Sequence, residues 1–333
     1  MRQPLHLTAN LARYLIVKRL RGEPHIPVVL MLEPLYTCNF ACPGCSPERR
    51  TGTKADWLPV EECLRAVDEC GAPIVSVCGG EPLIHDGIHE IIRGILDRGK
   101  YCILCTNALL LPRFMEKTGP DPHLSLAIHL DGLEATHDRL TGHPGAFQKA
   151  LDATRKAVAR GFRVNSNTTL YVETEIDEVV QLFAMLMEEV RIDSLLITPG
   201  YDFSNTGNGF FLKREQVVAR FKELLARVPE GWFGNSSLYL DFLRGETGLI
   251  CTPWGNPTRS PQGWQGPCYM LRDAFHPTYR ELLEKTPWAK YGTGSGEARC
   301  EGCMLHAGFE PTVALGRQIP ITRQLANAVR MFK

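Results

Sequence analysis

The chain has 333 residues, of which 44% are hydrophobic, so it is long and apolar enough to bury a large core. Its 37 Lys and Arg balance its 37 Asp and Glu, which leaves no net positive charge to attract nucleic acid. We find no secretory signal pattern and no apolar run of about 18 residues, and therefore expect a cytoplasmic globular protein. Twelve cysteines in a reducing compartment indicate metal or redox chemistry rather than a disulfide scaffold.

The first segment, residues 1–25, has the pattern of an amphipathic helix. Thr8 is a candidate cap, Leu11 and Leu15 form an apolar stripe, and basic residues such as Arg19 lie on other faces. We expect this helix to cover the bottom or the open side of a barrel that follows it. A basic amphipathic helix can also lie on an anionic membrane, so association with the inner face of the membrane is a second prediction.

Six apolar or β-branched runs follow, separated by amphipathic segments of helix length. These strand-like runs occupy residues 28–32, 74–77, 101–105, 124–130, 163–170 and 194–198. Repeated βα units favour parallel strands with helices outside, and the number six suits a partial barrel as readily as a doubly wound sheet.

The alternation of strand and helix patterns ends after Pro199, and we place a domain boundary near residue 200. A Gly/Asn-rich stretch is followed by a helix near residues 213–227 and then by loops rich in Pro, Gly and Trp. Residues 201–333 are therefore predicted to form a smaller, cysteine-containing C-terminal domain.

Three cysteines follow the first strand at a C-x3-C-x2-C spacing: Cys38, Cys42 and Cys45. They lie at the carboxyl end of a strand, where a parallel barrel carries its chemistry. A zinc knuckle needs a fourth Cys or His nearby, and none occurs between Cys45 and Cys63, although zinc and plain structural cysteines remain alternatives. Three cysteine ligands on a 4Fe-4S cube leave one iron open, and the amino and carboxylate groups of S-adenosylmethionine can chelate it.

The second strand ends in CGGEPL. Gly79 and Gly80 let the backbone approach a ligand, Glu81 can accept a hydrogen bond from a ligand ammonium, and Pro82 stiffens the turn. Alone, this sequence is as often an ordinary turn. Beside the cysteine motif it predicts a cofactor site, and the two motifs together resemble the signature and the GGE motif of the radical SAM superfamily.

Further segments resemble the adenosylhopane synthase family, the radical SAM enzymes of hopanoid biosynthesis. They cover nearly the whole chain: LEPLYTCNFACPGC, GAPIVSVCGGEPLIH, LCTNALLL, HLDGLEATHD, CTPWGNPTR, GPCYML and KYGTGSGEARCEGCMLHAGFEPT. The resemblance implies a partial (βα)6 TIM-like radical SAM barrel over residues 26–200. It also implies a transferase that adds the 5′-deoxyadenosyl radical to the terminal alkene of diploptene, forming the carbon–carbon bond of adenosylhopane.

The resemblance implies two kinds of partner, a small triterpene substrate and an electron donor such as a flavodoxin, a ferredoxin or a reductase. Two other classes of function stay open at this point. One is a radical SAM reaction on another unsaturated or C–H substrate, and the other is a non-enzymatic iron–sulfur protein.

Cys105 ends the third strand, in LCTNA, and we expect it to point into the barrel mouth. Cys102 is three residues earlier on the same strand, so the two thiols face opposite sides. The carbon radical left after adenosyl addition needs a hydrogen atom, and a thiol is a good donor. The resemblance implies the same cysteine as the reductant, whereas the alternative is a small buried apolar residue.

Polar residues lie near the ends of strands three to six, where ribose, carboxylate and adenine contacts are usually made. Each alone could equally be a turn-former or a satisfied core residue, but together they predict a cofactor-binding site. This set comprises Asn107, Asp131, Asn165, Asn167 and Tyr201, and His129 precedes Asp131 by two residues. His129 and Asp131 share a strand face by the alternation rule.

The C-terminal part contains a second group of cysteines. The spacing C-x11-G-x4-C followed by C-x2-C resembles the auxiliary-cluster domains behind many radical SAM barrels. The ligand candidates are Cys251, Cys268, Cys300 and Cys303, with Gly263 at the spacer position. Four thiolates can hold a second 4Fe-4S cluster or zinc, and structural cysteines without metal are the third alternative. His306 could replace one cysteine, but a lone histidine is more often only hydrogen-bonded.

Overall fold

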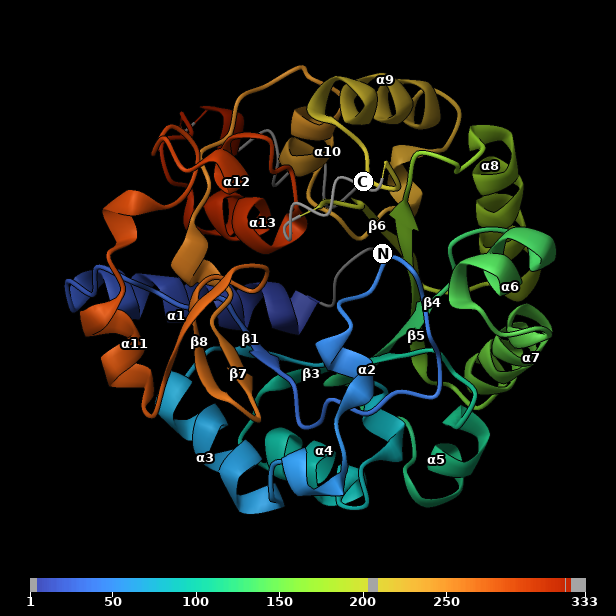
Figure 1. Cartoon of the computed structure of the whole chain (residues 1–333), viewed down its shortest axis with the longest axis horizontal. Coiled ribbons are helices and arrows are strands. Elements are labelled where there is room, and N and C mark those ends of the chain that lie inside the picture. The colour runs from blue at the N-terminus through green and yellow to red at the C-terminus, as the bar shows by residue number, and fades with distance from the viewer. Residues whose placement is uncertain (1–4, 203–208, 321, 325–333) are drawn as a thin grey trace.

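The computed structural model describes residues 5–202, 209–320 and 322–324, and its centre is a curved nine-stranded sheet (Figure 1). The strand order is β6-β5-β4-β3-β2-β1-β7-β8-β9. The strands are β1 Val29–Leu32, β2 Ile74–Val77, β3 Tyr101–Thr106, β4 Leu124–His129, β5 Arg163–Leu170, β6 Ser194–Pro199, β7 Thr258–Ser260, β8 Gly263–Pro267 and β9 Arg272–His276.

Strands β1 to β6 are parallel, and each pairs with the next one along the chain. A doubly wound sheet would reverse its strand order at a switch point, whereas a barrel keeps the strands sequential. The partial TIM-like barrel is therefore confirmed. All six predicted strands are present, and their observed ends lie within one residue of the predicted ones.

The helices are α1 Leu5–Leu20, α2 Glu48–Thr51, α3 Val60–Cys70, α4 Ile88–Asp97, α5 Leu111–Lys117, α6 Glu134–Thr141, α7 Ala146–Ala159, α8 Ile176–Ala184, α9 Arg214–Leu225, α10 Ser237–Leu243, α11 Tyr279–Lys285, α12 Ala298–Glu301 and α13 His306–Leu315. Helices α3 to α8 surround the parallel strands on their outer side (Figure 1). Alternate strand residues, such as Val75 and Leu104, are completely buried beneath these helices in one continuous hydrophobic core. The residues between them face the barrel interior, since strand side chains alternate.

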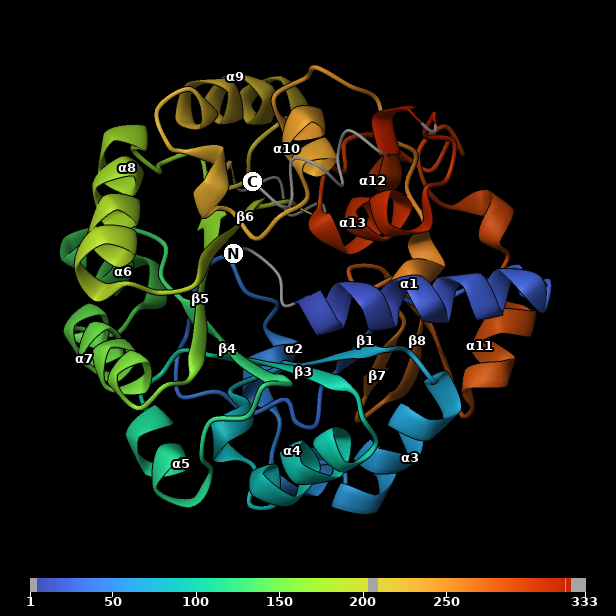
Figure 2. The same cartoon turned by 180° about the vertical axis from the view of Figure 1, so that it is seen from behind.

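Helix α1 covers the amino ends of the parallel strands. Leu7 packs against Ile74 and Tyr101, the first residues of β2 and β3. The helix thus lies on the side of the sheet opposite to α2, as comparison of Figures 1 and 2 shows. Thr8 lies inside the helix, so its prediction as the cap was wrong.

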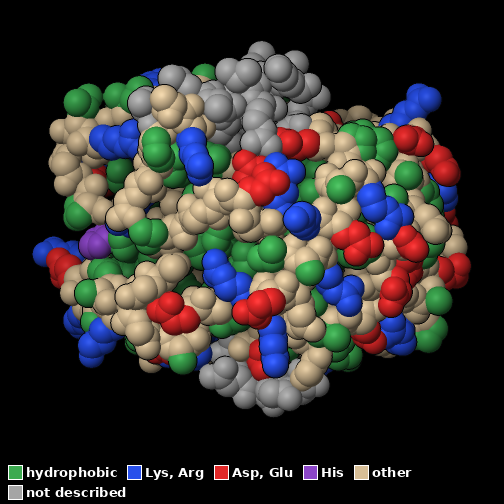
Figure 3. All heavy atoms as spheres, turned by 90° about the horizontal axis from the view of Figure 1, so that it is seen from above, with side chains coloured by type: hydrophobic (Ala, Val, Ile, Leu, Met, Phe, Trp, Pro, Cys, Tyr) green, Lys and Arg blue, Asp and Glu red, His purple; other side chains and the backbone are tan. Residues whose placement is uncertain are grey.

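Helix α1 carries three exposed large apolar side chains, Ile16 (57% exposed), Val17 (38% exposed) and Leu20 (83% exposed). Association with a membrane surface through this helix stays a prediction. No helix in the described ranges is both long and apolar enough to cross a membrane. On the face shown in Figure 3, acidic and basic side chains are interspersed rather than gathered into one patch, in agreement with the balanced composition.

The C-terminal part continues the central sheet. Strand β7 pairs in parallel with β1, and β8 and β9 follow it as antiparallel strands. The predicted boundary near residue 200 falls directly after β6 and stays a prediction. Part of the Gly/Asn-rich stretch that motivated it, residues 203–208, lies outside the described residues.

Candidate active site

The three N-terminal cysteines lie on one loop that follows β1. The backbone N–H of Phe40 donates a hydrogen bond to the Cys38 sulfur (3.4 Å), and such bonds to sulfur are typical of iron–sulfur ligands. Burial raises the pKa of Cys38 to about 11. Burial raises the pKa of Cys42 to about 12, and the neighbouring Cys45 and Cys38 thiols add to this shift. Three thiols close enough to repel each other's charge are suited to share one cationic cluster.

The CGGEPL turn holds the segment that leads to Cys38. The N–H of Glu81 donates to the Thr37 carbonyl at 2.8 Å. A side chain at Gly80 would place its Cβ 2.1 Å from the same oxygen, and Gly79 has a φ of 102°. Both positions therefore require glycine because the turn lies directly against residues 35–37. This reason for the glycines differs from the predicted approach of a ligand.

Glu81 is buried, and both its carboxylate oxygens have protein donors. Oε1 accepts from the Thr106 hydroxyl (2.7 Å) and the Leu83 N–H (3.1 Å), and Oε2 accepts from the Asn107 N–H (2.8 Å). Burial raises the pKa of Glu81 to about 6, although these donors oppose the shift. Oε2 can accept a second hydrogen bond, so the predicted bond from a ligand ammonium stays a prediction. In the protein the carboxylate fixes the end of β3 to the turn, with Pro82 starting the short helix Pro82–Ile84.

Asn107 joins β3 to the cysteine loop. Its Nδ2 donates to Oδ1 of Asn39 (2.7 Å), between Cys38 and Cys42. Its own Oδ1 accepts from the Leu109 N–H at 3.1 Å. Asn107 thus lies at the predicted site, but these contacts give it a positioning role for the loop.

The two cysteines of β3 face opposite sides, as the alternation predicts. Cys102 is fully buried in the core beneath the helices, whereas the Cys105 sulfur lies 3.5 Å from the Ser76 hydroxyl inside the barrel. Burial raises the pKa of Cys105, so at neutral pH this residue is a thiol, the form that can donate a hydrogen atom.

His129, which is partly exposed, and the buried Asp131 form a pair near the end of β4. Nε2 of His129 lies 2.6 Å from Asp131 Oδ2, and the N–H of Thr169 donates to Asp131 Oδ1 (2.7 Å). Burial lowers the pKa of His129, but Asp131 outweighs it and the net shift is upward. On β5, Asn165 accepts from Ser194 (2.8 Å), and Asn167 pairs in register with His129. The predicted polar set therefore surrounds the barrel interior, with one exception.

That exception is Tyr201, which lies beside the C-terminal cysteines. Its hydroxyl donates to the Arg299 carbonyl (2.9 Å), and Cys303 and Cys300 contribute, after burial, to raising its pKa to about 12. Its predicted place among the cofactor contacts is therefore wrong. The chain turns away from the barrel after β6, so alternation no longer predicts its direction.

Four cysteines from three distant segments meet in the C-terminal part. Burial raises the pKa of Cys251 well above its usual value, and the nearby thiols of Cys303, Cys268 and Cys300 add to this shift. The Leu271 N–H donates to the Cys268 sulfur at 3.4 Å, the same kind of bond as at Cys38. A Cβ at Gly308 would lie 2.5 Å from the Cys251 sulfur, so glycine leaves room for it.

His306 lies near this cysteine group but contacts Thr198 (3.3 Å). Burial lowers the pKa of His306 to about 4, which keeps the imidazole neutral at neutral pH. The hydrogen bond with Thr198 agrees with the prediction that His306 is not a metal ligand.

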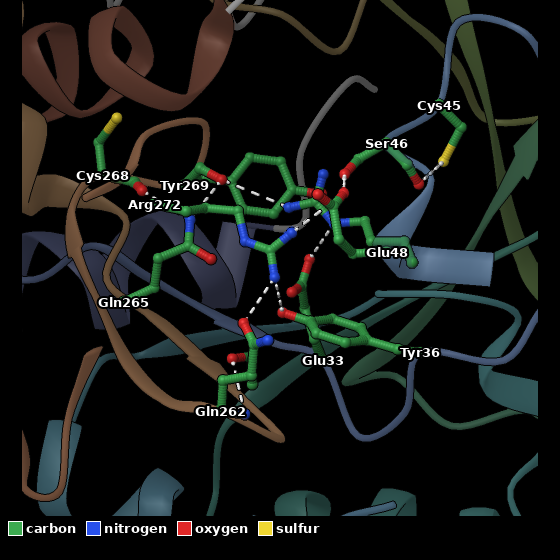
Figure 4. Close-up of polar contacts among 12 residues, drawn as sticks. Glu33, Tyr36, Cys45, Ser46, Glu48, Gln262, Gln265, Cys268, Tyr269 and Arg272 are labelled. Carbon is green, nitrogen blue, oxygen red and sulfur yellow. Dashed lines mark hydrogen bonds and ion pairs between the residues drawn. The ribbon is translucent and has the colours of Figure 1, made fainter. Parts of the chain in front are cut away.

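A polar network connects the two cysteine sites (Figure 4). The buried Arg49 donates to Glu33 Oε1 (2.7 Å) and to the Tyr269 carbonyl (3.4 Å), and its guanidinium lies 4.7 Å from the Tyr269 ring centre. Gln265 donates to the carbonyls of Cys268 (2.9 Å) and Tyr269 (2.8 Å). The loop carrying Cys45 and the strand leading to Cys268 are therefore packed together.

The donor sets fit iron–sulfur clusters. Within the described ranges, no group of three or more His, Cys, Asp or Glu side chains is arranged around a single metal ion. In a 4Fe-4S cube each cysteine thiolate binds a different iron. The cysteine sulfurs around a cube are therefore further apart than those around a single metal ion. The N-terminal loop offers three half-buried thiols with an N–H bond to one sulfur, and the C-terminal part offers four half-buried thiols with one such bond.

Comparisons with known proteins agree with this fit. The model of the radical SAM superfamily matches residues 32–187. The chain is 30% identical over 224 residues to the GTP 3',8-cyclase of Alkaliphilus oremlandii, covering 64% of this chain and 69% of that protein. The chain belongs to the radical SAM superfamily. It is an enzyme, and the cofactors of this superfamily are a 4Fe-4S cluster and S-adenosylmethionine.

Other similarities are narrower. The chain is 31% identical over 167 residues to the AdoMet-dependent heme synthase of Methanosarcina barkeri, covering 49% of this chain and 48%, about half, of that protein. Residues 195–325 match a domain of unknown function, DUF3463. A structure of anSMEcpe with bound AdoMet and Cp18Cys peptide has a TM-score of 0.55 at 15% identity, covering 92% of this radical SAM chain and all of that one, which shows the fold.

Sequence reasoning missed Glu33, Arg49, Cys78 and Tyr269. Cys78 was visible in CGGEPL but was treated only as part of the turn. Glu33 follows β1 at the position that alternation places inside the barrel, so the signal existed. Arg49 and Tyr269 are 220 residues apart, and nothing local predicts their contact.

Proposed function

We propose that this radical SAM enzyme transfers the 5′-deoxyadenosyl group to the terminal alkene of diploptene and forms adenosylhopane. The resemblance to the adenosylhopane synthase family supports this proposal over nearly the whole chain. The single structural observation that carries it is Cys105, a half-buried thiol inside the barrel. A reaction that ends on a carbon radical needs such a donor. The next residue along β3, Thr106, is hydrogen-bonded to Glu81 of the turn that holds the cysteine loop.

Cys38, Cys42 and Cys45 are proposed to hold the catalytic 4Fe-4S cluster. When bound, this cluster supplies the electron that cleaves S-adenosylmethionine to the 5′-deoxyadenosyl radical. Glu81 and Asn107 position the loop through their bonds to Thr106 and Asn39. The barrel wall around His129, Asp131, Asn165 and Asn167 is proposed to bind the nucleoside and the amino acid part of the cofactor.

Cys105 is proposed to quench the substrate radical. Addition to the terminal carbon of a 1,1-disubstituted alkene leaves a tertiary carbon radical. The protonated thiol gives a hydrogen atom to that carbon, which forms the saturated adduct and leaves a sulfur radical on Cys105. The enclosing strands keep water away from the radical before this transfer.

A second metal site is proposed at Cys251, Cys268, Cys300 and Cys303. Four thiols suffice for a closed 4Fe-4S cluster, and zinc binding to the same residues is the alternative. Support comes from the convergence of four thiols and from the Leu271 N–H bond to sulfur.

Anaerobic incubation with S-adenosylmethionine, a low-potential reductant and diploptene tests the proposal. Mass analysis should detect an adenosine-bearing adduct that requires all three components. Release of free 5′-deoxyadenosine without an adduct would instead indicate hydrogen abstraction from another substrate, the second candidate reaction. No cleavage at all, with an intact cluster, would exclude both.

A further inference from the structure

Three polar side chains form a row across neighbouring strands inside the barrel. The row consists of Glu33, Cys78 and Cys105, which follow the register-paired residues Leu32, Val77 and Leu104 of β1, β2 and β3. The paired residues are buried beneath the helices. Because successive side chains alternate, the next residue on each strand faces the barrel interior.

The two cysteines of this row are close enough for a disulfide bond. Neighbouring strands lie about 4.8 Å apart, and disulfides join Cα atoms about 4.4–6.8 Å apart. In this structure the Cys105 sulfur contacts the Ser76 hydroxyl (3.5 Å), two residues before Cys78, so a disulfide requires its side chain to turn toward Cys78. The two thiols are near enough for Cys105 to contribute, after burial and Glu33, to the raised pKa of Cys78. Cys78 is 6% exposed, so this residue is slightly accessible from solvent.

Glu33 offers a base beside Cys78. Its Oε1 accepts from Arg49 (2.7 Å), while its Oε2 is buried without a hydrogen-bond partner in the described part of the chain. A buried carboxylate oxygen without a donor is costly, so its position calls for a neighbour that supplies a proton. Burial raises the pKa of the Cys78 thiol well above its usual value, and the negative charge of Glu33 adds to this shift. Cys78 therefore needs a base before it can act as a thiolate.

We propose that Cys78 is the second thiol of the reaction and forms a disulfide with Cys105, while Glu33 accepts the proton of the Cys78 thiol. This inference rests on the hydrogen-donor role proposed for Cys105. No other cysteine is needed for this step. The row thus has one hydrogen donor, one resolving thiol and one base.

Cys105 gives a hydrogen atom to the carbon radical and becomes a sulfur radical. Glu33 takes the Cys78 proton, and the thiolate bonds to the Cys105 sulfur, giving a disulfide radical anion. That species loses one electron to a one-electron acceptor of the iron–sulfur class and becomes a disulfide. An external dithiol then supplies two electrons and two protons to restore both thiols.

The disulfide can be tested apart from the reaction. The full-length, cluster-loaded chain is equilibrated anaerobically with mixtures of reduced and oxidised dithiothreitol, then alkylated and digested. Trypsin separates Cys78 from Cys105, but the two peptides also contain Cys70 and Cys102. A Cys70→Ala/Cys102→Ala background removes these two thiols, which lie in the core outside the barrel interior, and should still give the cross-linked peptide. Cys78→Ser should abolish it.

A single-turnover experiment tests its place in the reaction. With diploptene and a reductant that is not a thiol, the background variant should accumulate about one disulfide per adduct. Cys78→Ser and Cys78→Ala should form the first adduct but no disulfide, and should stop after one turnover. Glu33→Gln, which keeps the shape of the side chain, should slow disulfide formation about 100-fold, the usual contribution of a general base.

The outcomes separate this inference from the proposed function. A background variant that gives no Cys78–Cys105 peptide under any dithiothreitol ratio overturns the inference, whatever products form. Adducts that accumulate over many turnovers in Cys78→Ser also overturn it. If no adduct forms but the disulfide does, the proposed function fails, while the dithiol pair in the barrel is supported.

Discussion

The two cysteine sites of this radical SAM enzyme are built in opposite ways. Cys38, Cys42 and Cys45 lie on one short loop, and a glycine turn and two asparagines fix that loop to the parallel strands. The C-terminal thiols come from three segments between residues 251 and 303, and tertiary packing alone brings them together. A local site can leave one iron open for a cofactor, whereas a site with four ligands closes its cluster. We therefore expect the first site to carry the chemistry and the second to support it.

The largest expected effect separates the two sites by activity. Cys42→Ala should abolish formation of 5′-deoxyadenosine, because the remaining two thiols cannot hold a cluster with one open iron. Anaerobic product analysis by liquid chromatography measures this. Cys63→Ala, a buried cysteine of α3, is the matched control and should still cleave S-adenosylmethionine. Cleavage by a variant lacking all three loop cysteines would contradict the assignment.

The next effect lies within the first site. Cys105→Ala should still consume S-adenosylmethionine, but the saturated adduct should fall strongly and radical-derived by-products should appear. Cys105→Ser should behave alike, because an O–H bond is too strong to give a hydrogen atom to an alkyl radical. Cys102→Ala, on the outer side of the same strand, is the control. Wild-type adduct rates in both Cys105 variants would mean that another group donates the hydrogen.

The next prediction concerns how much iron each of the two cysteine sites binds. The reconstituted chain should bind about eight irons, and removing Cys300 and Cys303 should leave about four, from four irons per cluster. Elemental analysis of iron and zinc on the same sample measures this. A wild-type value near four with stoichiometric zinc would show that the C-terminal site is a zinc site.

The smallest effect concerns the contact between the sites. Arg49→Met leaves Glu33 buried without its partner, which should lower the free energy of unfolding by about 3–5 kcal/mol. The exposed Arg65→Met should change it by less than about 1 kcal/mol. Urea denaturation of samples with equal iron content compares them. Equal stability of both variants would show that the Arg49 network does not hold the two regions together.

The sequence predicted the parts of this molecule that depend on neighbouring residues. All six parallel strands followed from short apolar runs, and the first cysteine loop followed from its spacing. The opposite directions of Cys102 and Cys105 followed from alternation alone. Tyr201 was misplaced because it lies beyond the last parallel strand, where no periodicity constrains the chain. The protein contacts of Gly80 and Glu81 could not be predicted, because residues 35–37 and Thr106 become their neighbours only through the parallel sheet.

The most direct test of the account is a turnover in D2O. The reconstituted chain is incubated anaerobically with S-adenosylmethionine, a low-potential reductant and diploptene, and the product is analysed by mass spectrometry. Because the proton of the Cys105 thiol exchanges with solvent, we predict an adenosine-bearing adduct with one deuterium bound to the former alkene carbon. Free 5′-deoxyadenosine together with unchanged diploptene would contradict the account.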